Sequence, residues 1–153
     1  MIKRIVDGGQ FCKVVDDVSA YLKLEEEANN YWHLLPNNIT TLKQAFGHDR
    51  MLAFNAFVWA NLNDQNKYDA GIIFIKDKNP KHGVEAFSEY IWLSANPKVG
   101  YKLFATAINF ARNNGFENII VGVSEKSPQK DKVKNLYKRL GFIKASESYI
   151  AKL

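Results

Sequence analysis

Apolar and polar positions follow two rhythms along the chain, and the last third shows both most clearly. Ser88–Ser94 is an aromatic and β-branched run of strand length. Beyond Gly100, apolar residues recur every three or four positions, which predicts a helix that starts at Gly100 and stops at Asn113–Gly115. Ile119–Val123 predicts a short strand buried on both faces. A second helical stripe ends at Gly141 and consists of Val133, Leu136, Tyr137 and Leu140.

The first half of the chain predicts a mixture of strands and helices. Ile2–Val6 has the composition of a strand, and Gly8 and Gly9 break it. The next apolar positions have helical spacing, at Phe11, Val14, Val15, Val18 and Tyr21. The other elements expected are a short helix, two strands and a charged loop, at 40–46, Met51–Trp59, Tyr68–Ile75 and Lys76–His82.

This order of elements resembles the GNAT superfamily of acyl-CoA-dependent N-acyltransferases over most of the chain. Leu136–Phe142 (LYKRLGF) is similar to the family's LYxxLGF segment. Gly100–Gly115 and the strand after it are similar to the cofactor-binding helix and its following strand, and Ala70–Ile75 is similar to the strand that precedes the cofactor strand. A final strand is expected after Gly141, and Phe142–Leu153 resembles the ending of small GNATs encoded by tailed phages.

The resemblance implies a single α/β domain over residues 1–153. Its central sheet would be mixed and mostly antiparallel, with helices on both faces. An acceptor-side half (1–82) and a cofactor-side half (83–153) are expected. A chain of this length can bury a proper core, which agrees with one domain.

The resemblance also implies a reaction, the transfer of an acetyl group from acetyl-CoA to a primary amine of a small molecule or peptide in a ternary complex. It makes Tyr137 the acid that protonates the leaving thiolate, because a phenol is protonated at neutral pH. Core packing is the alternative, since Tyr137 lies on an apolar stripe. Glu89 is the candidate base, and by alternation it shares an apolar face with Phe87, Ile91 and Leu93. A solvent-exposed strand edge is the alternative for Glu89.

The resemblance places the coenzyme A contacts where the strand ends and the helix starts. Leu93 and Ser94 stand where the family's strand bulges and offers backbone groups to the pantetheine arm. Backbone N–H groups at a helix start bind anions, and Val99, Gly100, Tyr101 and Lys102 are expected to present them. Lys98 would either meet the phosphate as a charge or block the loop. The chain departs from the family's loop, Arg/Gln-x-x-Gly-x-Gly/Ala, because Ala95 replaces Arg or Gln and Lys98 replaces the first glycine. Lys130 replaces an Asn that often contacts the cofactor.

Charge is unevenly distributed along the chain, whose net charge is +5. Residues 98–153 hold 11 Lys and Arg against 4 Asp and Glu, whereas residues 1–97 hold 10 against 12. A basic half suits the phosphates of coenzyme A, and it equally suits nucleic acid. The alternative function is a catalytically inactive GNAT-fold protein that binds a protein or nucleic acid through this half, and Ala95 and Lys98 favour it. A coenzyme A-binding regulator without turnover is a third hypothesis, and a homodimer stays open.

The remaining candidate residues concern the acceptor, metals and the cellular compartment. Tyr31, Trp32 and His33 would border the acceptor pocket, with His33 as an alternative base; a surface histidine and core aromatics are the simpler interpretation. The three histidines lack metal-ligand spacing, so no metal is expected. Cys12 is the only cysteine, and no apolar stretch approaches the roughly 20 residues of a membrane span. A cytoplasmic protein is therefore expected.

Overall fold

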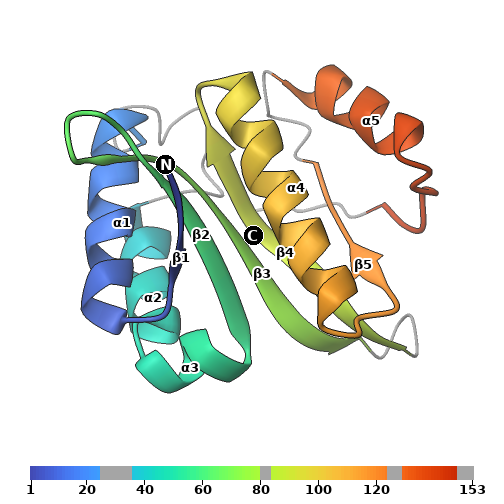
Figure 1. Ribbon diagram of the computed structural model, residues 1–153, viewed down its shortest axis with the longest axis horizontal. Helices are drawn as coiled ribbons and strands as arrows, with labels where there is room; N and C mark the ends of the chain where they lie inside the picture. The colour runs from blue at the N-terminus through green and yellow to red at the C-terminus, as the bar shows by residue number, and fades with distance from the viewer. Residues whose placement is uncertain (25–35, 80–83, 124–128, 148–153) are drawn as a thin grey trace, which may run out of the picture. The chain divides into compact units, whose positions relative to one another are not determined.

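The computed structural model describes residues 1–24, 36–79, 84–123 and 129–147. The chain divides into two compact units, Met1–Val121 and Gly122–Leu153, and each is described by itself. The elements in chain order are β1 (Ile2–Ile5), α1 (Gly8–Tyr21), α2 (Pro36–Phe46), α3 (Asp49–Phe54), β2 (Ala56–Leu62), β3 (Tyr68–Asn79), β4 (Val84–Ser94), α4 (Pro97–Asn113), β5 (Ile119–Ile120) and α5 (Lys130–Arg139) (Figure 1).

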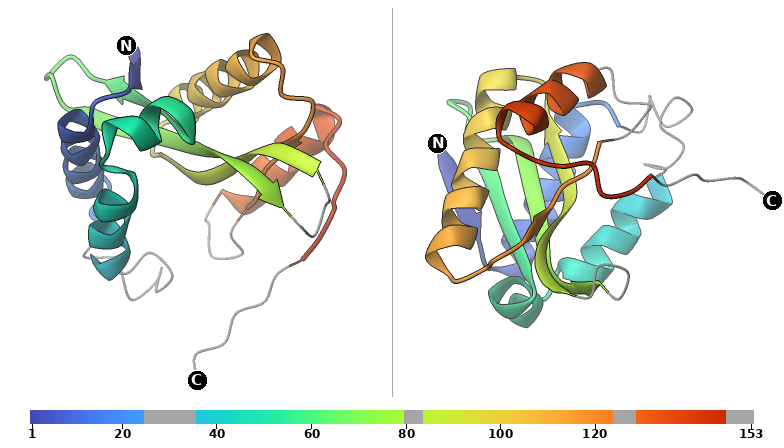
Figure 2. Two further views of the ribbon diagram at one scale, coloured as in Figure 1. Left: turned by 90° about the horizontal axis from the view of Figure 1, so that it is seen from below. Right: turned by 90° about the vertical axis from the view of Figure 1, so that its right-hand side faces the viewer.

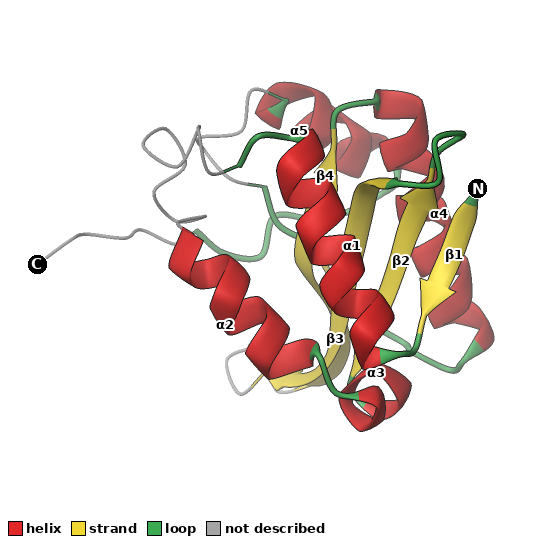
Figure 3. Ribbon diagram, turned by 90° about the vertical axis from the view of Figure 1, so that its left-hand side faces the viewer, coloured by secondary structure: helices red, strands yellow, loops and turns green. Residues whose placement is uncertain are grey.

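The first unit is built on one sheet with the strand order β1-β2-β3-β4-β5. The pairs from β1 to β4 are antiparallel, and β4 pairs with β5 in parallel. Helices α1 and α2 cover one face of the sheet and α4 covers the other (Figures 2 and 3). The expected mixed, mostly antiparallel sheet with helices on both faces is confirmed. None of the helices within the described ranges is both long and apolar enough to cross a membrane.

The α1 face of the sheet carries an aliphatic core. Helix α1 begins after Asp7, whose carboxylate accepts the backbone N–H of Gln10 and caps the helix. The apolar stripe expected from the sequence is buried against the sheet, at Phe11, Val14, Val15 and Val18. Asp17, on the rim, pairs with Lys13 and accepts the backbone N–H of Tyr68 at 3.2 Å. Burial alone would raise the pKa of Asp17, but these hydrogen bonds and the charges of Lys13 and Lys67 lower it overall.

The α4 face carries an aromatic core. The rings of Phe74 and Phe87 stack with centroids 4.4 Å apart, and both side chains are fully buried. Phe110 of α4 packs on Phe87 from the helix side. The Arg4 guanidinium lies 4.5 Å from the centre of the Phe110 ring, and burial lowers the pKa of Arg4.

Several predicted boundaries are wrong, each for a local reason. The strand expected at Met51–Trp59 begins at Ala56, because its first residues form α3; a short apolar run has no period that separates helix from strand. Strand β3 continues to Asn79, through part of the expected charged loop. The strand expected at Ile119–Val123 covers only Ile119–Ile120 and is half-buried. In the C-terminal segment, the described residues 142–147 form no strand.

The start of α1 approaches the turn between α2 and α3 closely. A Cβ atom at Gly8 would lie 2.2 Å from the backbone oxygen of Gly47. The Gly8 N–H donates to Asp49 Oδ1 at 2.6 Å, which ties the start of α1 to the start of α3. Glycine at position 8 is therefore required by backbone contact, and this contact positions the helix that covers the sheet.

We expect Gly8→Ala to lower the free energy of unfolding by about 2 kcal/mol or more, because a backbone oxygen cannot move aside as a side chain can. Urea unfolding followed by circular dichroism measures the loss. Gly9→Ala is the matched control, since a Cβ there would meet only the side chain of Asp7 at 3.3 Å. Equal effects of the two substitutions would contradict the close approach at Gly8.

Candidate functional site

Strand β4 loses its outer neighbour halfway along its length. It pairs with β5 only at Phe87 and Ser88. From Tyr90 to Ser94, the outer edge of β4 has no strand partner among the described residues, while β3 pairs along the other edge. An unpaired strand edge presents a row of backbone N–H and C=O groups that an extended ligand can bind.

A β-bulge lies where this open edge begins. Phe74 of β3 pairs with Glu89 and Ile73 pairs with Ile91, so Tyr90 is an extra residue on β4. The bulge expected at Leu93 and Ser94 is thus wrong in position, since both residues pair regularly with β3. Alternation cannot reveal a bulge, and nothing in the sequence marked Tyr90.

The bulge also corrects the face assigned to Glu89. Glu89 lies opposite Phe74, on the α4 face with Phe87, and it is partly buried. Past the bulge, Ile91 and Leu93 pack with the α1-side core instead. The prediction that Glu89 shares a face with Phe87 is confirmed, and the prediction that it shares one with Ile91 and Leu93 is wrong.

The turn from β4 into α4 is closed by its own hydrogen bonds. Ser94 Oγ donates to the backbone oxygen of Asn96 at 2.7 Å and accepts the Asn96 N–H at 3.2 Å. Asn96 is the N-cap of α4, and Pro97 is the first residue of the helix. The helix therefore begins three residues before Gly100, where the sequence prediction placed its start.

Asn96 occupies the backbone N–H groups that a phosphate would bind. Its Oδ1 accepts the N–H of Lys98 at 2.9 Å and that of Val99 at 3.4 Å, and its carbonyl accepts the N–H of Gly100. Tyr101 and Lys102 lie beyond the first turn, where their N–H groups bond to helix carbonyls. The expectation of free backbone donors from Val99 to Lys102 is therefore wrong.

Gly100 has a packing role. It is buried, and a Cβ atom there would lie 3.2 Å from Ser94 Cβ and 3.5 Å from the indole nitrogen of Trp92. The glycine lets the second turn of α4 pack closely on the end of β4. The Trp92 ring in turn stacks on Phe104 of α4, with centroids 4.9 Å apart. This packing fixes the helix start relative to the open edge.

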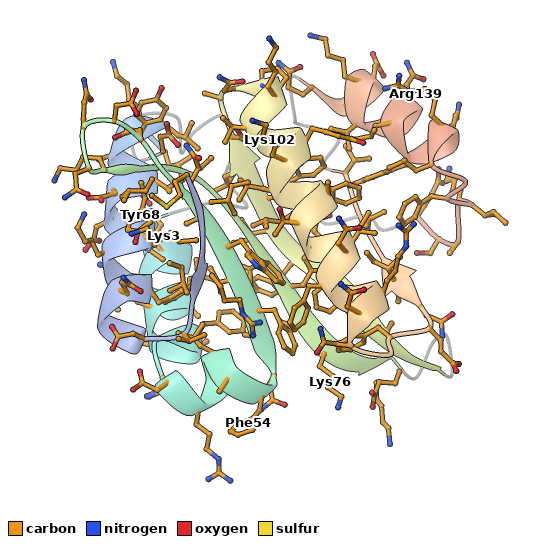
Figure 4. All side chains as sticks on the ribbon, in the orientation of Figure 1. Lys3, Phe54, Tyr68, Lys76, Lys102 and Arg139 are labelled. Atoms are coloured by element: carbon orange, nitrogen blue, oxygen red, sulfur yellow. The ribbon has the colours of Figure 1, made fainter. Side chains whose placement is uncertain are left out.

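Two cations lie on the exposed side of α4 near its start. Lys98 and Lys102 are exposed and four residues apart, so they share one side of the helix. Figure 4 labels Lys102 on α4. Neither lysine makes an ion pair within the described part of the chain. They are the charges available to a phosphate at this end of β4.

The second unit contains Tyr137 on α5. Tyr137 is 8% exposed, and its hydroxyl donates to the carbonyl oxygen of Gly122 at 2.7 Å. Helix α5 ends at Arg139. Gly141, two residues on, has a φ of +84°, and the chain turns back there so that the Phe142 N–H donates to the backbone carbonyl oxygen of Tyr137. The Phe142 ring packs on the Tyr137 ring, with centroids 5.4 Å apart. Lys130 is the first residue of α5.

The structure therefore separates the predicted site residues into groups. Leu93, Ser94, Lys98, Val99 and Gly100 lie together at the end of β4 and the start of α4, with Glu89 earlier on the same strand. Tyr137 and Lys130 belong to the second unit. The candidates at 31–33 lie outside the described residues. Sequence reasoning missed Asn96, although Asn before Pro at a helix start is a capping signal.

The α1 side of β4 borders an apolar pocket, which sequence reasoning also missed. Helices α1 and α2 form one wall and the sheet forms the other. Ile91 and Leu93 bring β4 into the lining. Within the described ranges, no group of three or more His, Cys, Asp or Glu side chains could hold a metal ion.

No family model and no curated protein matches the sequence. The fold is similar to solved structures that share little sequence with it. An aminoglycoside acetyltransferase from an uncultured soil metagenomic sample, in complex with sisomicin, has a TM-score of 0.65 and 15% identity, and the match covers 100% of this chain and 96% of the other. A ribosomal-protein-alanine N-acetyltransferase from Brucella melitensis gives 0.62 and 12%, with coverages of 100% and 98%. A transcriptional regulator from Bacillus halodurans gives 0.65 and 15%, with coverages of 100% and 99%.

We expect Asn96→Ala to lower the free energy of unfolding by about 1 kcal/mol, because the Lys98 and Val99 N–H groups lose their acceptor. Asn109→Ala is the matched control, since Asn109 is exposed in the interior of the same helix, where alanine is the better helix former. Urea unfolding of both variants measures the difference. A loss no larger in the Asn96 variant than in the control would contradict the capping role.

Proposed function

We propose, from the premise that the chain has the fold of the GNAT acetyltransferases, that it transfers an acetyl group from acetyl-CoA to a primary amine. The observation that carries the proposal is the edge of β4 from Tyr90 to Ser94, which has no strand partner among the described residues and ends beside the two cations at the start of α4. An open strand edge followed directly by positive charge suits a ligand that is amide-rich at one end and phosphorylated at the other.

The pantetheine arm of acetyl-CoA fits the strand edge chemically. Its amide groups can exchange hydrogen bonds with the backbone of β4 as another strand would. The fit at the phosphate end is different, because Asn96 holds the first backbone donors of α4. Lys98 and Lys102 would therefore meet the phosphates with side-chain charge, and that contribution falls as salt screens it.

The reaction needs one bond to form, one bond to break and two protons to move. The neutral amine nitrogen attacks the thioester carbonyl carbon and forms the new C–N bond. The C–S bond then breaks, and the thiolate leaves with its electron pair. In the proposal, Glu89 accepts the proton that the amine loses, directly or through a water molecule, and Tyr137 donates a proton to the thiolate. Both roles follow the family resemblance.

The structure supports a packing role for Tyr137 as well. Its ring packs on Phe142 at the helix end, and its hydroxyl already donates to Gly122. The ring contact would survive a change to phenylalanine, whereas the proton would be lost. This difference makes the two roles separable by experiment.

A second function is favoured by the same helix start. Asn96 accepts the α4 backbone N–H groups that a phosphate would otherwise bind. Helix α5 carries exposed cations that could bind a nucleic acid instead, at Lys132, Lys138 and Arg139. A GNAT-fold protein without turnover that binds nucleic acid through these cations would show salt-sensitive affinity for duplex DNA or RNA and none for acetyl-CoA.

We expect acetyl-CoA to bind with heat detectable by titration calorimetry. Lys98→Ala and Lys102→Ala should each weaken acetyl-CoA binding by about two- to fivefold at low salt. The difference in affinity between each variant and the unchanged protein should shrink at high salt. Lys78→Ala is the matched control, since Lys78 is an exposed lysine on β3. The absence of heat, together with an unchanged melting temperature, would remove the acetyltransferase proposal and leave the nucleic-acid function to be measured.

We expect Tyr137→Phe to lower turnover by about 10²-fold or more with little change in acetyl-CoA affinity, because only the proton donor is removed. The release of coenzyme A thiol measures turnover. Tyr21→Phe, at an exposed tyrosine of α1, is the control. If Tyr137→Phe costs only about 1 kcal/mol of stability, the amount of one lost hydrogen bond, and keeps full turnover, then Tyr137 has a packing role alone.

A further inference from the structure

The pocket between the helices and the sheet is almost wholly apolar. Its cavity volume is about 70 Å³, and it is open at its mouth. Its lining comes from α1 and the residues after it, α2, β2, β3 and β4. The lining residues are Phe11, Val14, Val15, Val18, Ser19, Leu24, Ile39, Leu42, Val58, Gly71, Ile72, Ile73, Ile91 and Leu93.

The lining excludes a polar ligand. The Ser19 hydroxyl is the one polar side-chain group among these residues, and none of them is charged. The nearby carboxylate of Asp17 is already engaged by Lys13 and the Tyr68 N–H. A ligand with many hydroxyl or ammonium groups would bury them here without partners, and this desolvation is costly. An alkyl or aryl group has no hydrogen bonds to water that it would lose on entering the pocket.

The bulge at Tyr90 connects this pocket to the open edge of β4. Without the extra residue, alternation would place Ile91 on the α4 face with Glu89. With it, Ile91 and Leu93 face α1 and complete the pocket wall. Both residues belong to the segment of β4 whose outer edge is unpaired. A molecule held in the pocket therefore lies against the strand that is expected to hold the thioester.

We propose that this pocket binds the apolar part of the amine acceptor, so that the acceptor is a primary amine that carries an alkyl or aryl group and few polar groups. This inference rests on the proposed function, since it names the class of amine that is acetylated. An aminoglycoside, the class named for three of the similar structures, does not suit the lining.

A series of amines tests the inference. Thiol release from acetyl-CoA is measured with ethylamine, butylamine and hexylamine, and calorimetry measures the binding of the same amines without acetyl-CoA. Each methylene that enters the pocket should raise affinity and kcat/KM by about fourfold until the pocket is full. The alcohol 5-aminopentan-1-ol matches hexylamine in length but ends in a hydroxyl. Its affinity and kcat/KM should be about tenfold lower than those of hexylamine.

Two variants connect the chain-length dependence to the pocket. A Cβ atom at Gly71 would sit in ordinary contact, 3.9 Å from Val14 Cγ1. Gly71→Val should therefore fill the pocket and lower the affinity and kcat/KM for hexylamine to the values for ethylamine. Ile39→Gln, at a partly buried position of α2, places a polar group in the lining and should lower hexylamine binding even if the first variant fails to fold. Ile108→Gln, at a partly buried position of α4, is its control and should leave the series unchanged.

The two arms separate failure of the inference from failure of the proposed function. Thiol release with equal efficiency for all three amines, or with the amino alcohol preferred, would overturn the inference and keep the acetyltransferase. Chain-length-dependent binding that Gly71→Val or Ile39→Gln abolishes, with no thiol release from any amine, would keep the apolar site and remove the acetyltransferase. Absence of amine binding in calorimetry together with flat kinetics would also overturn the inference.

Discussion

The stacked pair Phe74 and Phe87 is the constraint on which the candidate site depends. The two rings lie nearly parallel on the α4 face, and both are fully buried. Phe74 is opposite Glu89, and Phe87 is one of the two residues through which β4 pairs with β5. A slip of β4 by one residue would turn the Phe87 ring to the other face of the sheet and separate it from Phe74. The stack therefore fixes where β4 leaves β5 and where the bulge begins.

The bulge then directs side chains from neighbouring positions of β4 toward opposite faces of the sheet. On one side of Tyr90, Glu89 points toward the α4 face; on the other side, Ile91 and Leu93 point toward α1. A carboxylate and an apolar wall thus come from neighbouring positions of the same strand, without either being placed in the environment of the other. A single extra residue thus places a polar position beside an apolar wall.

The sequence predicts those parts of the fold that depend on local chemistry. The helix ends at Gly115 and Gly141 are confirmed, because both glycines have a positive φ that closes the last turn. The layered sheet with helices on both faces, which the family resemblance implied, is confirmed as well. The bulge at Tyr90 and the pocket could not be predicted, because strand register and the space between layers arise from long-range packing. Asn96 could have been found, since its capping signal is local.

The LYxxLGF segment has a structural explanation that does not involve a reaction. In the second unit, Gly141 takes the left-handed conformation, and the Phe142 N–H donates to the backbone carbonyl oxygen of Tyr137. The rings of Tyr137 and Phe142 pack against each other. These are the requirements of a helix ending with a hydrophobic contact across it. They account for an aromatic residue, a glycine and a phenylalanine at these spacings, with no reaction involved. The phenolic oxygen is the one atom of Tyr137 that this helix ending does not need, so a catalytic interpretation of the segment depends on that atom alone.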